Sequence, residues 1–192
     1  MMTQREIWVP TAVVVAGWLG AYPLVAQGTV LSNQAIRAEF GPRGLTALAY
    51  PGRGLNHRFR RDEAWVTLDG RKIESAALAP PTRRREGPRL TYTWRAEPYH
   101  IEVVYELRPE WRFLSKQIAI SVPGPRSTIE EIGLLDATLD RTPSSVVIPR
   151  SARPQLGTGD YGAAFRFGTQ GLLAVAQNPF LHVEHRGARF TL

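Results

Sequence analysis

Apolar and polar residues alternate in many short runs along this chain, and no window shows a sustained helical period. The clearest run is IEVVYEL at 101–107, with four apolar residues of one parity and two glutamates of the other. The run at 114–122 is similar, except that Lys116 shares the parity of its apolar residues. Because successive side chains of a strand point to opposite faces, both runs predict half-buried β-strands.

The same reasoning predicts a series of further strands. We expect them at 34–40, 45–49, 65–68, 71–74, 90–95, 129–139, 163–167, 172–177 and 181–184. Asp69-Gly70 supplies the positive φ that a two-residue hairpin turn requires. A second turn, Arg186-Gly187-Ala188, is expected to pair 182–185 with 189–192, and 80–88 (PPTRRREGP) has the composition of a surface loop.

These elements define a fold class. About eleven strands with hairpin connections, and no helices to cover a parallel sheet, predict an all-β fold. The expected arrangement is an antiparallel sandwich of two large sheets.

The first 28 residues have the pattern of an export leader. Arg5 precedes an uncharged apolar stretch at 9–19, and cleavage after Ala26 or Gly28 fits a small-x-small site. The alternative is an uncleaved membrane anchor, which needs about 20 apolar residues, whereas two prolines and a glutamine interrupt this segment. We therefore expect a signal peptide at 1–28, one β-sandwich domain at 29–192 and no membrane span after cleavage.

The residue types present limit the cofactors and the compartment. The chain contains no cysteine, which excludes a disulfide framework and fits a bacterial periplasmic or extracellular protein. His182 and His185 are the only close histidine pair, and a spacing of three on a strand puts their rings on opposite faces. We expect no metal site and no cofactor.

The formal net charge of +7 raises the question of nucleic-acid binding. Only two of the basic residues, Lys72 and Lys116, are lysines. The arginines form two short clusters, at 58–61 and 83–85, which we expect in loops. Since no nucleic-acid module accompanies them, solvated loop charge is the favoured interpretation and nucleic acid is not an expected partner.

Catalytic carboxylate pairs are not evident. Glycoside hydrolysis requires two carboxyl groups flanking the bond. Glu130 and Glu131 are neighbours on an expected strand and should face opposite sides, while Glu102 and Glu106 alternate with an apolar face and are expected on the solvent side. There is no Gly-x-Ser-x-Gly elbow, so we assign no catalytic residue.

Three residues are candidates for carbohydrate binding. Trp111 lies between two strong strands beside two arginines, and Asp160 and Tyr161 follow a glycine-containing loop. Aromatic rings stack on sugars and polar groups orient them. The alternatives are packing of the rings against their own loops and a turn-forming role for Asp160. Trp65 and Trp94 lie in strand patterns and are expected in the core.

Segments 31–48, 111–122 and 159–180 resemble strands of the galactose-mutarotase-like supersandwich, in particular the amino-terminal domain of α-galactosidase-like glycoside hydrolases. The resemblance implies that the catalytic carboxylates of such an enzyme lie on a separate barrel and that the sandwich supports the sugar pocket. True mutarotases use a histidine and a glutamate on their own sandwich. Here His57, His100, His182 and His185 do not fit that pattern.

The sequence thus favours a non-catalytic amino-terminal domain of an exported carbohydrate-active enzyme, with carbohydrate and a catalytic barrel as partners. Its strand-like ending at 189–192 is expected to continue into a longer protein. The uncharged segment 171–181 is the candidate barrel-facing surface, and a buried central strand, which has the same composition, is the alternative. Two alternatives remain open: a stand-alone carbohydrate-binding or interaction module of the cell envelope, and a small sugar epimerase.

Overall fold

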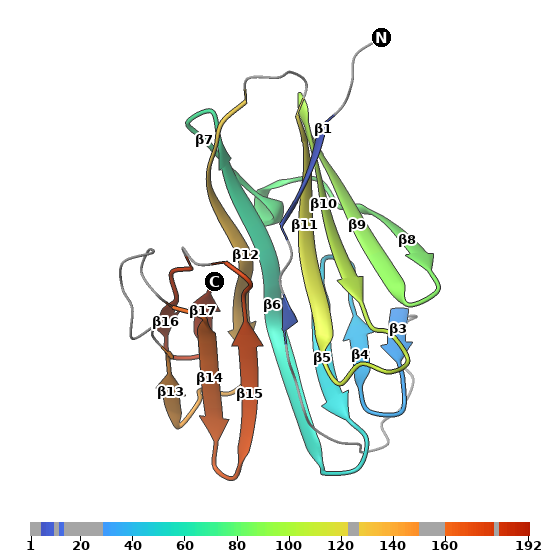
Figure 1. Ribbon diagram of the computed structural model, residues 1–192, viewed down its shortest axis with the longest axis vertical. Coiled ribbons are helices and arrows are strands. Elements are labelled where there is room, and N and C mark those ends of the chain that lie inside the picture. The colour runs from blue at the N-terminus through green and yellow to red at the C-terminus, as the bar shows by residue number, and fades with distance from the viewer. Residues whose placement is uncertain (1–4, 10–11, 14–28, 123–126, 150–159, 179–180) are drawn as a thin grey trace.

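The computed structural model of the chain consists almost entirely of β-strands (Figure 1). It describes residues 5–9, 12–13, 29–122, 127–149, 160–178 and 181–192, with side chains from residue 29 onward. Every strand pair within these ranges is antiparallel, and a single short 3₁₀ helix, η1 (Ser75–Ala77), interrupts them. The expected all-β, antiparallel sandwich is confirmed. The described part of the chain includes no helix long and apolar enough to cross a membrane.

One large sheet has six described strands in the order β1-β11-β10-β9-β8, with β2 also paired to β11. Apart from β1 and β2, its strands follow one another along the chain as hairpins, which matches the regular alternation of the sequence here. The strands are β1 (Arg5–Val9), β2 (Ala12–Val13), β8 (Thr82–Glu86), β9 (Arg89–Ala96), β10 (Tyr99–Glu106) and β11 (Leu114–Val122).

The other large sheet has eight described strands in the order β16-β17-β12-β6-β5-β4-β3, with β7 paired to β6. Its central strand, β6, is 14 residues long and pairs with β5 in its first half and with β7 and β12 further along. The strands are β3 (Thr29–Ser32), β4 (Arg37–Phe40), β5 (Leu45–Tyr50), β6 (Leu55–Leu68), β7 (Arg71–Glu74), β12 (Ile129–Leu139), β16 (Glu184–Arg186) and β17 (Arg189–Thr191).

A small third sheet, which the sequence did not lead us to expect, consists of β13 (Ser145–Val147), β14 (Gly162–Phe167) and β15 (Gln170–Val175). It lies beside β16 and β17 in Figure 1. The Phe165 ring of β14 packs against Phe190 of β17, with ring centroids 4.2 Å apart, so the small sheet shares the core of the large one.

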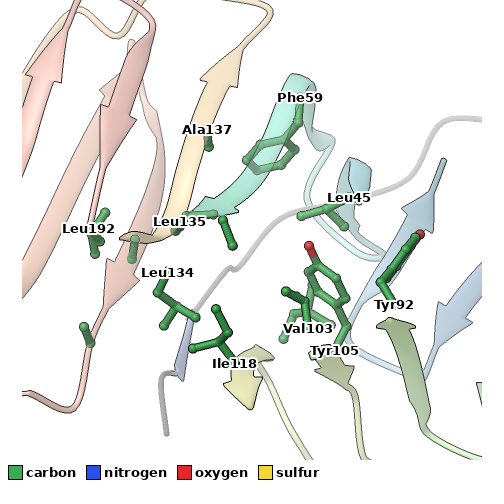
Figure 2. Packing of buried hydrophobic residues seen from close by; sticks show 14 of the residues in the cluster. Leu45, Phe59, Tyr92, Val103, Tyr105, Ile118, Leu134, Leu135, Ala137 and Leu192 are labelled. Atoms are coloured by element: carbon green, nitrogen blue, oxygen red, sulfur yellow. The ribbon is translucent and has the colours of Figure 1, made fainter. Parts of the chain in front are cut away.

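The inner faces of the sheets form one apolar core. The four apolar residues of the run 101–107 are buried as expected, and the Tyr105 ring packs edge-on against Phe40 at 4.9 Å. Figure 2 shows side chains from the two large sheets facing each other: Val103, Tyr105 and Ile118 from one, and Leu45, Phe59 and Leu135 from the other. Burial of one face of most of the strands is the physical origin of the period-two pattern.

A buried ion pair links the two large sheets within this core. The Lys116 ammonium of β11 donates to Asp62 Oδ1 of β6 at 2.6 Å and to the Glu63 carbonyl at 3.0 Å. Asp62 Oδ2 accepts from the Tyr105 hydroxyl at 2.6 Å and from the Leu45 amide at 2.8 Å. The expectation that Lys116 lies among apolar side chains is confirmed, and Asp62 is the partner that allows a charge there.

Turns at both predicted positions have the required backbone. Asp69 and Gly70 have φ values of 50° and 75°, and they join β6 to β7 as a two-residue hairpin turn. Gly187, with φ of 59°, lies in the turn between β16 and β17. The strand before this second turn is 184–186 rather than 181–184, because its register starts with Glu184 opposite Thr191.

Two loop assignments were wrong. Residues 82–86, expected in a loop, form the edge strand β8, whose five residues are all exposed, so their polar composition reflects solvent on both faces. The arginines at 83–85 therefore lie on a strand. Arg58, Arg60 and Arg61 also lie on a strand, β6, where Arg61 bonds Asp136 of β12 at 3.2 Å.

Candidate functional site

Three connections meet at one end of the sandwich and enclose a groove of about 610 Å³. They are the β3–β4 turn, the β8–β9 turn and the β10–β11 loop. Volumes of about 300–1,000 Å³ are typical of small-molecule sites. The lining residues are Leu31, Ser32, Asn33, Gln34, Arg85, Gly87, Pro88, Leu107, Pro109 and Glu110.

Asn33 fixes one wall of the groove. Its Oδ1 accepts hydrogen bonds from the amides of Ala35 and Ile36 at 2.9 and 2.8 Å, which closes the turn after β3. Its Nδ2 donates to the carbonyls of Arg108 and Trp111 at 2.7 and 2.8 Å. One side chain therefore holds the β3–β4 turn against the β10–β11 loop. The sequence analysis missed Asn33, although asparagine directly after an apolar run is a turn signal.

The β8–β9 turn forms the opposite wall. Gly87 has φ of 54°, a conformation that glycine adopts readily, and lets the chain reverse into β9. The Pro88 carbonyl accepts a hydrogen bond from the Leu107 amide at 2.9 Å, which ties this turn to the end of β10. The groove is thus held by backbone hydrogen bonds and by the half-buried side chain of Asn33.

A buried carboxylate lies beneath the loop. Glu106 is 3% exposed, and its Oε1 accepts from Arg108 Nε at 2.6 Å while Oε2 pairs with Arg89 Nε at 3.1 Å. The hydrogen bond from Arg108 to this carboxylate raises the pKa of the Arg108 guanidinium. The expectation that Glu106 faces solvent was wrong, because two arginines neutralise it and bury its side chain.

Glu130 and Glu131 also differ from expectation, since both are exposed rather than on opposite faces. The pairing of β12 with β6 shifts register between Ile129 and Glu131, and such a bulge turns successive side chains out of strict alternation. Glu130 Oε1 accepts a hydrogen bond from the Gly70 amide at 2.7 Å, so it stabilises the β6–β7 turn.

Trp111, the first predicted carbohydrate-binding residue, lies beside the groove and is partly exposed. Its ring stacks on Phe113 with centroids 4.5 Å apart and planes 18° apart. The Arg108 guanidinium lies 4.8 Å from the same ring. Much of the indole therefore packs within its own loop.

The accessible chemistry of the groove is polar. Ser32, Gln34, Arg85 and Glu110 are all exposed. Within the part of the chain that the structure describes, the side chains of Gln34 and Glu110 have no hydrogen-bond partner, which leaves an amide and a carboxylate available to a ligand. Arg85 Nε bonds only the nearby Gly87 carbonyl, at 3.5 Å.

Asp160 and Tyr161 lie elsewhere. They precede β14, which is beside β16 and β17 in Figure 1, whereas the β10–β11 loop is near β3 on the other side of the molecule. Asp160 is 3% exposed and accepts a hydrogen bond from the Val183 amide at 3.2 Å, while Tyr161 is 50% exposed. The structure does not bring Trp111 together with these two residues, and the buried position of Asp160 favours its structural alternative.

The histidines occupy separate environments. His57 is 2% exposed beside Phe167, and burial lowers the pKa of its imidazole. His182 is exposed and lies 3.4 Å from Glu184. Among the residues with described placement, no group of three or more histidine, aspartate or glutamate side chains is arranged to hold a metal ion.

The uncharged segment 171–181 mostly faces inward. Leu172, Ala174, Ala176 and Leu181 belong to the core, and Leu173 is 38% exposed. Phe180, which the sequence analysis placed in the same surface, lies outside the described residues. The apolar composition of this segment is therefore largely explained by β15 and its contribution to the core.

Comparison of the chain with known proteins identifies no relative. No protein-family model, no curated protein and no solved structure matches the chain.

Proposed function

We propose that this chain is a non-catalytic β-sandwich domain that binds saccharide for an exported carbohydrate-active enzyme. The observation that carries the proposal is the groove of about 610 Å³, which is lined by the exposed amide of Gln34 and the exposed carboxylate of Glu110. The partly exposed Trp111 follows Glu110 directly in the chain. Saccharide sites combine such hydrogen-bonding groups with a flat aromatic surface.

The carboxylates of this region support binding rather than hydrolysis. Glycosidases use two carboxyl groups about 5–10 Å apart. Glu110 lines the groove, but Glu106, its near neighbour in the chain, is buried and paired with Arg89 and Arg108. Because the Glu106 carboxylate is buried and held by two guanidinium groups, it is not presented to a ligand, so its role is to hold the loop.

The proposal also includes the type of sandwich, the cleavage of the leader and the location of the protein. The galactose-mutarotase-like type of sandwich, the cleaved leader and the periplasmic or extracellular location rest on the resemblance and the leader pattern described above. The all-β architecture with antiparallel sheets is compatible with that type of sandwich.

Binding can be tested with the full chain against a panel of neutral and acidic oligosaccharides, by calorimetry or NMR titration. For the best ligand of the panel, we expect Gln34→Ala and Glu110→Ala each to weaken binding about tenfold, equivalent to about 1.4 kcal/mol for a lost hydrogen bond. Glu97→Ala is the matched control, because Glu97 is an exposed glutamate in the β9–β10 turn at the far end of the hairpin.

Two results would contradict the proposal. Failure of the whole panel to bind would remove saccharide as the ligand. Binding that survives both groove substitutions but is lost in Tyr161→Ala would place the site beside β14 instead.

A further inference from the structure

The outer strands β8, β16 and β3 of the two large sheets are short, and β8 and β16 are charged and exposed. β8 has five residues, all exposed, and three of them are arginines. In the eight-stranded sheet, β16 has three exposed residues, Glu184-His185-Arg186, and β3 has four residues. Short length and charge are the usual devices by which edge strands avoid pairing with other chains.

β11 lacks both devices. It has nine residues, of which six are buried. Its single charged residue, Lys116, forms an ion pair with Asp62 inside the core and so does not protect the edge. One side of β11 pairs with β10 along seven residue pairs. Its other side would be an exposed row of backbone amides and carbonyls if nothing covered it.

In the full chain an amino-terminal segment covers this side. β1 pairs with β11 antiparallel from Arg5 opposite Val122 to Val9 opposite Ile118. β2 continues in the same register, with Ala12 opposite Ser115 and Val13 opposite Leu114. Seven of the nine residues of β11 therefore have a partner in residues 5–9 or 12–13. The sequence of residues 5–13 is REIWVPTAV.

This occupant lies inside the segment expected to be removed as a leader. Its loss would leave one side of this long, apolar strand without a neighbour, and such an edge is an efficient template for strand addition. Since Ile7 and Val9 pair opposite Ile120 and Ile118, the chemistry that fits is an extended segment with β-branched residues at alternate positions.

We propose that the outer edge of β11 is a strand-acceptor site, filled by residues 5–9 and 12–13 in the full chain. In the processed protein, an extended apolar strand of a partner chain takes their place. Main-chain hydrogen bonds to β11 supply the affinity, and residues that match Ile118 and Ile120 supply the specificity.

The pairing in the full chain is tested first, by disulfide formation in a protein that has no native cysteine. Glu6 and Ser121 are direct partners, and Ser121 is partly exposed, so Glu6→Cys/Ser121→Cys disturbs the core little. We expect an intrachain disulfide in this variant and none in the control Ile7→Cys/Ser121→Cys, because a one-residue offset points the two side chains to opposite faces. Equal cross-linking of both pairs, or of neither, would overturn the proposal.

Binding in trans is tested in the full-length variant Ile7→Pro/Trp8→Pro. Proline has no N–H, and adjacent residues of a strand alternate in direction, so one of the two substitutions removes a ladder bond. A labelled peptide with the sequence of residues 5–13 should bind this variant at least tenfold more tightly than the wild-type chain, as measured by fluorescence anisotropy. Binding to neither protein, or equally to both, would overturn the proposal.

Two controls define how the peptide binds and what occupies the site. N-methylation of the peptide at residues 6 and 8, or at 7 and 9, should abolish binding in only one of the two series, because only one set of amides faces β11. Light scattering of the double-proline variant should show a monomer. A dimer that the peptide does not dissociate would identify a second copy as the occupant and refute the partner strand.

Discussion

The buried ion pair between Lys116 and Asp62 gives the sharpest stability prediction for this fold. Lys116→Met retains most of the apolar stem but removes the ammonium, whose side chain is 3% exposed. Asp62 would then remain as a carboxylate that is 1% exposed at its side chain, with the Tyr105 hydroxyl and the Leu45 amide as its donors.

The expected cost follows from what Asp62 loses and keeps. Removing one member of a buried pair destabilises proteins by about 3–5 kcal/mol. Because two donors to Asp62 survive, we expect the lower end, about 3 kcal/mol. In Lys116→Met/Asp62→Asn the uncompensated charge is gone, so the double variant should cost at least about 1 kcal/mol less than the sum of the single substitutions.

Urea unfolding of the full chain measures these free energies, and the chain supplies its own control. Lys72 is the second of only two lysines, and its side chain is 52% exposed beside Glu74. Lys72→Met should cost less than about 1 kcal/mol, as surface pairs do. Two results would refute the buried ion pair as a source of stability. One is a Lys116→Met variant that loses no more unfolding free energy than Lys72→Met, and the other is a double-mutant cycle that shows no coupling.

Two further predictions concern buried positions. Burial lowers the pKa of His57 below its ordinary value of 6.5, so the stability that neutral His57 confers should be complete above pH 6.5 and be lost as the pH falls towards the pKa of the folded state. The difference between the urea midpoints at pH 7 and pH 5 should therefore be smaller in His57→Phe than in wild type. An equal reduction of this difference in the exposed control His182→Gln would contradict the prediction. A methyl group at Gly133 would overlap the Trp65 indole, so Gly133→Ala should lower stability by about 1–3 kcal/mol. The cost, measured by thermal unfolding, should shrink in a Trp65→Leu background, and an undiminished cost there would exclude this overlap as its cause.

The sequence alone determined the strands whose inner and outer faces differ. The predicted runs 114–122 and 129–139 coincide with β11 and β12, and 101–107 lies along β10. The turn at Asp69-Gly70 could also be predicted from the sequence, because aspartate and glycine adopt positive φ more readily than most residues. Alternation and turn chemistry are local, so they can be read without knowledge of the partner strands.

Only the tertiary structure decided the elements whose character depends on a distant neighbour. Residues 82–86 form a strand because β9 offers them an edge, although their composition is that of a loop. Glu106 is buried because Arg89 and Arg108 neutralise it, and Asn33 becomes part of the groove through hydrogen bonds to residues more than 70 positions away. Trp111 and Asp160 were grouped by residue type, yet they lie on different parts of the sandwich, because pairing between strands far apart in sequence sets where each loop emerges.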